Sequence, residues 1–154
     1  TLGESFSLPP IAAARILLGY TRDEDALLAA LLHDTVEDNW FSLPQVALFF
    51  NPTVQRIVDG IIQLNSHLAT IQREDSSIHE NMEQLLNESD PRGLQVKLAD
   101  RLHYMRTIEG HLSLDKQQQI TEETQQFFVP IAKHLGLQAV EKELSEIVLS
   151  RCSG

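Results

Sequence analysis

The chain has 154 residues, of which 42% are hydrophobic and 22% charged, and 22 acidic residues against 12 Lys and Arg give a formal net charge of -10. This composition excludes a disordered chain, and the negative charge argues against nucleic acid or an anionic membrane as a partner. No apolar run reaches the ~20 residues that span a bilayer, and no signal-peptide pattern opens the chain. The single Cys152 cannot form an internal disulfide, which fits a cytoplasmic protein of one domain.

Two helix starts are visible near the beginning of the chain. Pro10 stands at an early helical position, where its missing N–H costs nothing, and predicts a helix over 11–18. Thr21 and Glu24 have the spacing of a capping box, which predicts a second helix over 26–36.

The next segment repeats the same signals. Ser42 and Gln45 have capping-box spacing before 46–50, and Asn51 followed by a proline is an N-cap signal for another helix. Apolar residues recur behind it at helical spacing: Val54, Ile57, Val58, Ile61 and Ile62. Residues 65–75 are polar and lack a period, so they are predicted to form a loop.

The second half is also helical in pattern. A short helix is predicted over 77–86, and Asp90 followed by a proline starts a long one. One apolar stripe marks this long helix: Leu94, Leu98, Leu102 and Met105. Ser113 is predicted to cap the next helix, and Pro130 to kink it.

The chain closes with Gly136 as a predicted C-cap and a final helix over 138–149. No stretch shows the alternation of a β-strand, and no internal repeat is present. We therefore expect an all-α fold, with about eight helices packed as a single domain over residues 1–154.

The first segment that could carry out chemistry lies at the end of a predicted apolar helix. It contains His33, Asp34, Glu37 and Asp38. Residues four apart share a helix face, and adjacent His and Asp side chains suit a divalent cation that takes nitrogen and oxygen ligands. Carboxylates beside the cation would orient or deprotonate water. The alternative is a solvated acidic turn, but acidic side chains at a helix C-terminus oppose the macrodipole unless a positive charge is near.

The second segment places Lys97, Asp100, Tyr104 and Thr107 on one polar stripe of the predicted long helix, with Arg101 beside it. A carboxylate among basic and hydroxyl groups could hold a metal ion while its neighbours bind phosphate. Taken alone, the segment is equally compatible with an ordinary amphipathic helix that carries ion pairs.

Together these segments resemble a known family. HDTVED (33–38) and KLADRLHYMRT (97–107) are similar to the two signature motifs of the HD-type hydrolase domain of RelA/SpoT homologues, the enzymes of the bacterial stringent response. Three further stretches resemble the family in the same order: GESFSLPPIAAARIL (3–17), VDGIIQL (58–64) and FFVPIAKHLGL (127–137). The resemblance covers essentially the whole chain.

The resemblance implies an all-α HD domain that uses manganese to remove the 3′-pyrophosphate of guanosine tetra- or pentaphosphate. Transferred by position, His33, Asp34 and Asp100 would bind Mn²⁺, and the catalytic pair Glu37 and Asp38 would position and activate water. The expected substrate-binding residues are those of the second motif: Lys97, Arg101, Tyr104 and Thr107.

Two departures from the family pattern keep alternatives open. Pro9 stands where the family has a histidine that completes the ligand set, and Tyr104 replaces an asparagine that helps to hold the nucleotide. One alternative is a degenerate domain, catalytically weak or inactive, with a regulatory role. Another is an HD phosphohydrolase for a different nucleotide.

The length of 154 residues leaves no room for the synthetase domain that bifunctional family members carry. The chain is expected to be a stand-alone small hydrolase or a fragment. In the second case a synthetase or regulatory domain would be its partner.

Overall fold

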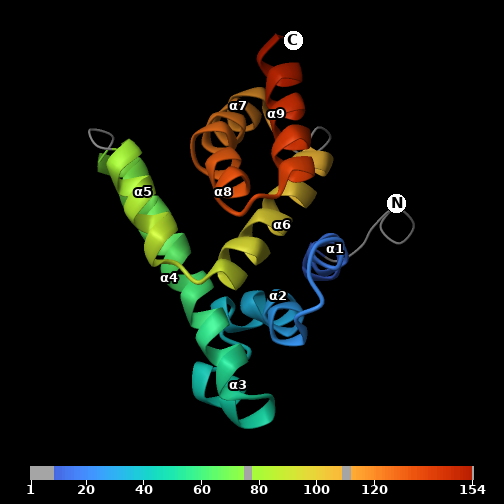
Figure 1. Cartoon of the computed structure of the whole chain (residues 1–154), viewed down its shortest axis with the longest axis vertical. Coiled ribbons are helices and arrows are strands. Elements are labelled where there is room, and N and C mark those ends of the chain that lie inside the picture. The colour runs from blue at the N-terminus through green and yellow to red at the C-terminus, as the bar shows by residue number, and fades with distance from the viewer. Residues whose placement is uncertain (1–8, 75–77, 109–111, 154) are drawn as a thin grey trace.

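A computed structural model describes residues 9–74, 78–108 and 112–153 (Figure 1). Within these residues the chain is helical and no strand is present, which confirms the predicted all-α class. The first five helices are α1 (Pro9–Leu17), α2 (Glu24–Glu37), α3 (Leu43–Phe49), α4 (Pro52–Glu74) and α5 (Ile78–Glu88). They are followed by α6 (Pro91–Thr107), α7 (Leu114–Glu123), the π-helical turn η2 (Thr124–Phe128), α8 (Val129–His134) and α9 (Gln138–Ser153). Because α7, η2 and α8 follow one another without a break, the described helices agree with the predicted number of about eight.

The most central helix is α6, which crosses the middle of the molecule (Figure 1). Its Val96 and Ala99 belong to one hydrophobic core with α1, α2, α3 and the first half of α4. Leu94, Leu98 and the two following apolar residues of the predicted stripe belong to a second core with α5, α7, η2, α8 and α9. The same helix therefore contributes to both cores.

Most predicted helix starts are confirmed by their capping bonds. The Ser42 side chain accepts from the Gln45 N–H, and the Gln45 side chain accepts from the Ser42 N–H, so this capping box is complete. Asn51 accepts from the Val54 N–H, and the predicted caps Asp90 and Ser113 each accept from a backbone N–H of their own helix.

The predicted capping box of Thr21 and Glu24 is wrong. The N-cap of α2 is Asp23, whose carboxylate accepts from the N–H groups of Asp25 and Ala26. The Thr21 hydroxyl accepts from the Asp23 N–H instead. Asp23 displaces Thr21 because its carboxylate stands directly before the first helical turn and also favours the positive end of the helix dipole.

The predicted loop over 65–75 is also wrong as far as it is described, because α4 continues without a break to Glu74. Leu64, Leu68 and Ile71 follow at helical spacing and pack into the second core, which holds the polar segment in a helix. The predicted start at 77 lies outside the described residues, and α5 extends two residues beyond the predicted end at 86.

Two C-terminal features agree with the sequence. The interruption expected at Pro130 takes the form of the π-helical turn η2, which comes directly before α8. Gly136 has a positive φ of 72° and closes α8, with its N–H donating to the Lys133 carbonyl and the Leu137 N–H donating to the Ala132 carbonyl. None of the described helices has the length and apolar character needed to cross a membrane.

Candidate active site

The site begins at the C-terminal end of α2, where His33 is buried against α6. His33 Nε2 lies 2.9 Å from Asp100 Oδ2 and 3.3 Å from Asp34 Oδ1. Asp34 comes from the same helix and Asp100 from α6, so the fold brings His33 and Asp34 next to Asp100, which lies 66 positions after Asp34 in the sequence. The imidazole is 3% exposed, whereas the two carboxylates remain open to solvent.

The orientation of the imidazole is fixed from behind. His33 Nδ1 lies 3.0 Å from the Ala30 carbonyl oxygen and 3.2 Å from that of Ala29. Carbonyl oxygens only accept, so Nδ1 carries a proton and Nε2 is the atom presented to the carboxylates. This arrangement is typical of histidines that bind a metal ion through Nε2.

The electrostatics of the cluster favour a positive charge at its centre. Burial alone would lower the pKa of His33, but the hydrogen bond to Asp100 and the charges of Asp100 and Asp34 outweigh it, so the pKa lies above its usual value. Protonated His33 therefore supplies positive charge between the two carboxylates.

The three side chains fit a divalent cation in their chemistry. One imidazole nitrogen and two carboxylate oxygens form a mixed donor set, and donors that share a cation at about 2.1 Å stand about 3.0–3.4 Å apart. The two contacts of Nε2 are close to this spacing. Nevertheless, no group of three or more His, Cys, Asp or Glu side chains in the described residues is arranged as a ready-made metal site. Binding a cation would replace the direct contacts between imidazole and carboxylate.

The acidic pair, Glu37 and Asp38, follows about one turn later at the end of α2. Glu37 is exposed in the last turn of α2, and its Oε1 accepts a hydrogen bond of 2.9 Å from Asn65 Nδ2 on α4. Asp38 is the exposed C-cap of α2, and its N–H donates to the Asp34 carbonyl, while the Asn39 N–H donates to the Val36 carbonyl. Asn65 was missed by the sequence analysis because it falls in the segment predicted as a loop, although the spacing of Leu64 and its apolar successors could have revealed the helix.

Lys97 lies one turn before Asp100 on α6. Burial lowers the pKa of its amine, and the nearby charges of Asp100, Glu37 and Asp34 only partly oppose that effect. Lys97 lines a small cavity of about 140 Å³ with residues of α4, α7 and η2. A weakly solvated amine that lines a cavity is suited to bind an anion that enters the cavity.

Arg101 lines the same small cavity but is already paired. Its guanidinium donates to Glu123 Oε1 at 2.7 Å and to the Thr124 hydroxyl at 3.3 Å, and it stacks 4.3 Å from the centre of the Phe128 ring. The guanidinium also lies 5.8 Å from the centre of the Tyr104 ring. Arg101 therefore ties α6 to α7 and η2, a role that the local sequence did not indicate.

The other two expected substrate residues are exposed further along α6. Tyr104 is 36% exposed, and the Thr107 hydroxyl donates to the carbonyls of His103 and Tyr104 within the helix. Pro9 is the first residue of α1, and the stretch 3–8 of the resemblance lies outside the described residues.

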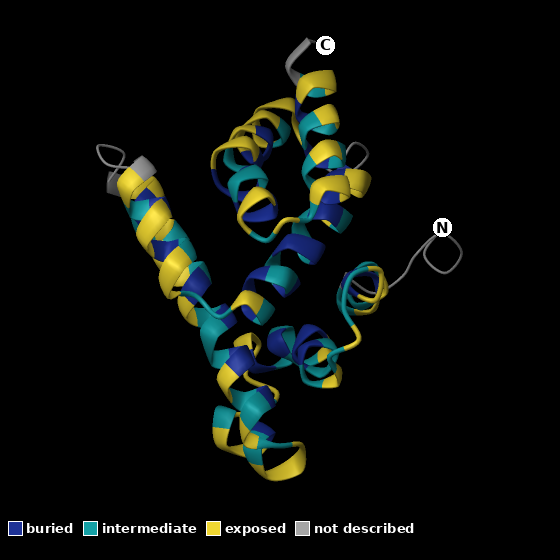
Figure 2. Cartoon of the chain, viewed as in Figure 1, coloured by how far each residue is buried: buried dark blue, intermediate teal, exposed yellow. Residues whose placement is uncertain are grey.

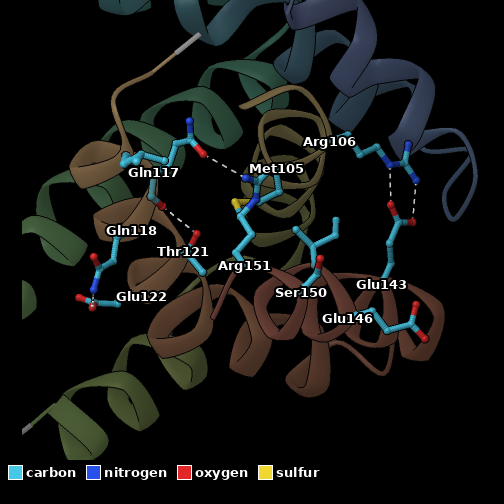
Figure 3. Close-up of a pocket in the computed structure, with 12 residues that line it drawn as sticks. Met105, Arg106, Gln117, Gln118, Thr121, Glu122, Glu143, Glu146, Ser150 and Arg151 are labelled. Carbon is cyan, nitrogen blue, oxygen red and sulfur yellow. Dashed lines mark hydrogen bonds and ion pairs between the residues drawn. The ribbon is translucent and has the colours of Figure 1, made fainter. Parts of the chain in front are cut away.

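A larger cavity lies elsewhere. It measures about 970 Å³ and lies between α6, α7 and α9, where Arg106 pairs with Glu143 and Arg151 donates to Gln117 (Figure 3). None of the metal-binding or catalytic residues expected from the sequence lines it. We therefore place the candidate site at His33 and Asp100, where the titratable groups converge.

A family model described as "HD domain" matches residues 2–138. The chain belongs to the HD-domain family. This identification confirms the family resemblance drawn from the HDTVED and KLADRLHYMRT motifs.

Curated relatives of this HD domain are much longer proteins. A guanosine-3′,5′-bis(diphosphate) 3′-pyrophosphohydrolase of Haemophilus influenzae is 35% identical over 146 residues, which cover 94% of the chain and 21% of the relative. A GTP pyrophosphokinase rsh of Brucella ovis is 36% identical over 147 residues, covering 94% of the chain and 19% of the relative. The HD domain thus spans about a fifth of the length of these relatives.

A solved structure shows the same fold. It is described as a metazoan ortholog of SpoT that hydrolyses ppGpp, and it is 24% identical to the HD domain, with a TM-score of 0.65. The match covers 93% of the chain and 79% of the solved chain. This neighbour confirms the all-α HD fold.

Proposed function

We propose that this HD domain is a manganese-dependent hydrolase that removes the 3′-pyrophosphate of guanosine tetra- or pentaphosphate. The observation that carries the proposal is the convergence of His33, Asp34 and Asp100 from α2 and α6. The names of the curated relatives and of the solved neighbour support the choice of substrate. The proposal concerns a single hydrolase domain over 1–154, and the single Cys152 suits a cytoplasmic location.

In the proposed mechanism His33 Nε2, Asp34 and Asp100 hold the cation. A bound divalent cation would lower the pKa of water and neutralise phosphate charge. Glu37, oriented by Asn65, and Asp38 position the attacking water and accept its proton. This division of roles explains why a domain with a net charge of -10 could accept a polyanionic substrate.

The remaining proposed roles concern the nucleotide. Lys97 lines the small cavity and binds a phosphate group there through its amine, which also interacts with the charges of the nearby acidic side chains. Tyr104 and Thr107 are exposed on α6 and contact the nucleotide, while Arg101 shapes that surface from its pair with Glu123.

The direct test measures Mn²⁺ binding and ppGpp hydrolysis in the wild type and in Asp100→Asn. Losing one charged donor should weaken Mn²⁺ binding and lower kcat/KM by ~100-fold or more. Asp115→Asn on α7 is the matched control, because it makes the same chemical change outside the cluster. Wild-type protein that binds no Mn²⁺, or equal activity in both variants, would contradict the proposal.

A second test addresses the ligand that the family pattern leads one to expect at Pro9. Pro9→His places an imidazole at the start of α1, and we expect tighter Mn²⁺ binding and higher activity. Pro10→His is the matched control, since it turns the imidazole by about 100° around the helix. The same gain in both variants would show that a specific fourth ligand is not involved.

A further inference from the structure

A cluster of large apolar side chains is exposed at the α3 end of the molecule. We call these residues the α3 patch: Trp40, Leu48, Phe49 and Phe50. Trp40 and Leu48 are each 78% exposed, and the two phenylalanines are 60% and 43% exposed. Figure 2 shows exposed residues on α3 at the opposite end of the molecule from the C-terminus. Single exposed apolar residues are normal, but four large ones within the eleven residues 40–50 point to an interaction surface.

The backbone that presents the α3 patch is well defined. Asn39 adopts a positive φ of 64°, and the Trp40 N–H donates to the Thr35 carbonyl at 2.8 Å, which closes α2 with a Schellman motif. The complete capping box then starts α3, and Val46 anchors this helix in the core at 1% exposure. The patch is therefore a fixed outer surface and not a frayed end.

The charges around the patch indicate which partner it fits. Residues 39–55 contain no Asp, Glu, Lys or Arg, although 22% of the whole chain is charged and the net charge is -10. Two copies that approach each other elsewhere would repel, whereas at this surface no charge has to lose its hydration. An anionic lipid surface would be repelled by the rest of the molecule.

The size of the patch also fits a second copy. A large side chain of this kind buries about 150–250 Å², so the exposed parts of the three aromatic residues and Leu48 supply roughly 400–650 Å². A standard specific interface buries about 800 Å² per partner. We propose that two copies of this chain dimerise through the α3 patch, with the same patch on both sides of a two-fold axis. The modest area points to a weak, reversible dimer.

The sole tryptophan of the chain reports directly on this interface, because it is Trp40. Sedimentation equilibrium from ~1 µM to ~200 µM should show the mass rising from 17.4 kDa towards twice that value. Over the same concentration range Trp40 emission should shift to shorter wavelength, and quenching by acrylamide should fall about twofold as the indole leaves water.

Leu48→Lys tests the patch while it keeps the reporter. The introduced charge should raise the dimer dissociation constant by about tenfold or more. Leu114→Lys on α7 is the matched control, because Leu114 is 81% exposed and lies outside the patch. It should dimerise like the wild type, and circular dichroism should show both variants folded.

Three results would overturn the proposal. The wild type could stay monomeric up to ~200 µM, or both lysine variants could dimerise as the wild type does. The third is a shift of Trp40 emission with phosphatidylcholine vesicles while the protein stays monomeric, which would assign the patch to lipid.

Discussion

His33 lies between carboxylates that reach it from two helices, and its protonation state decides what those carboxylates do. The protonated imidazole forms an ion pair with Asp34 and Asp100, whereas the neutral imidazole offers the Nε2 lone pair to a cation. A metal ion at the proposed site would therefore compete with the proton for this atom. The raised pKa of His33 means that the competition extends above the ordinary titration range of histidine.

The raised pKa of His33 predicts that the stability of the metal-free protein depends on pH. The pKa of His33 is raised above its unfolded value of 6.5, so its stabilising effect is complete below about pH 6.5 and is lost as pH rises through the folded pKa. Urea unfolding in EDTA should therefore show that the free energy of unfolding of the wild type falls, relative to that of His33→Gln, as the pH rises through the folded pKa of His33. A constant difference between the two proteins would contradict the prediction.

The second residue-scale prediction concerns Asn65, which holds Glu37 in place. Asn65→Ala should lower kcat for ppGpp by ~10-fold, because the carboxylate loses its orientation, and should leave Mn²⁺ affinity and KM nearly unchanged. The matched control is Gln63→Ala on the same helix, whose side chain bonds only Asp59 among the described contacts. An equal loss of kcat in the two variants would show that the orientation of Glu37 by Asn65 does not explain the effect.

The sequence singles out the candidate site residues but not their surroundings. His33, Asp34 and Asp100 stand out because charged groups interrupt apolar helices, and the fold does bring them together. The pairing of Arg101 with Glu123 was not predictable, because the partners are 22 positions apart and belong to different helices. A local sequence pattern predicts which residues share a helix face, but it does not predict which other helix packs against that face.

At the scale of elements, the sequence predicted the helical class and most boundaries because caps are local. The box of Ser42 and Gln45 is correct since both side chains bond within one turn. The segment 65–75 was judged by its polar composition, and tertiary packing overrides that signal, since Ile71 is buried at 2% exposure. A spacing rule also does not predict which of two nearby residues caps a helix, as with Thr21 and Asp23.

The contact between α6 and the end of α7 gives a prediction at this scale. Glu123→Gln removes the negative charge that pairs with Arg101, whose side chain is only 12% exposed, and should lower the free energy of unfolding by ~1–2 kcal/mol. Glu122→Gln is the matched control, because Glu122 is exposed and accepts only from Gln118 among the described contacts, so it should change stability by less than ~0.5 kcal/mol. Urea unfolding of both variants checks the difference, and equal losses would contradict it.

At the scale of the molecule, α6 connects the chemistry with the architecture. It contributes apolar residues to both hydrophobic cores and carries Asp100, Lys97 and Arg101 along its polar side. A shift of α6 would change the distance between Asp100 and His33 and repack both cores together. The position of the site is therefore tied to global stability and not to a mobile loop.

The net charge of -10 leads to the last prediction, which concerns salt. Exposed ion pairs such as Arg106 with Glu143 weaken as salt rises, but each contributes only ~0.2–1 kcal/mol. The general repulsion among 22 acidic residues is screened at the same time, since the Debye length falls from about 30 Å at ~10 mM to about 8 Å at ~150 mM salt. We expect the second effect to win, so that NaCl raises the free energy of unfolding near neutral pH by ~1 kcal/mol.

Urea unfolding in EDTA at the two salt concentrations measures this balance, and the same protein supplies its own control. Near the sequence pI of about 4.9 the excess negative charge is neutralised, so the repulsive contribution disappears and only the ion pairs respond to salt. The stabilisation by NaCl should then vanish or change sign. Stabilisation of equal size at both pH values would mean that salt acts through apolar burial, because that contribution does not depend on net charge.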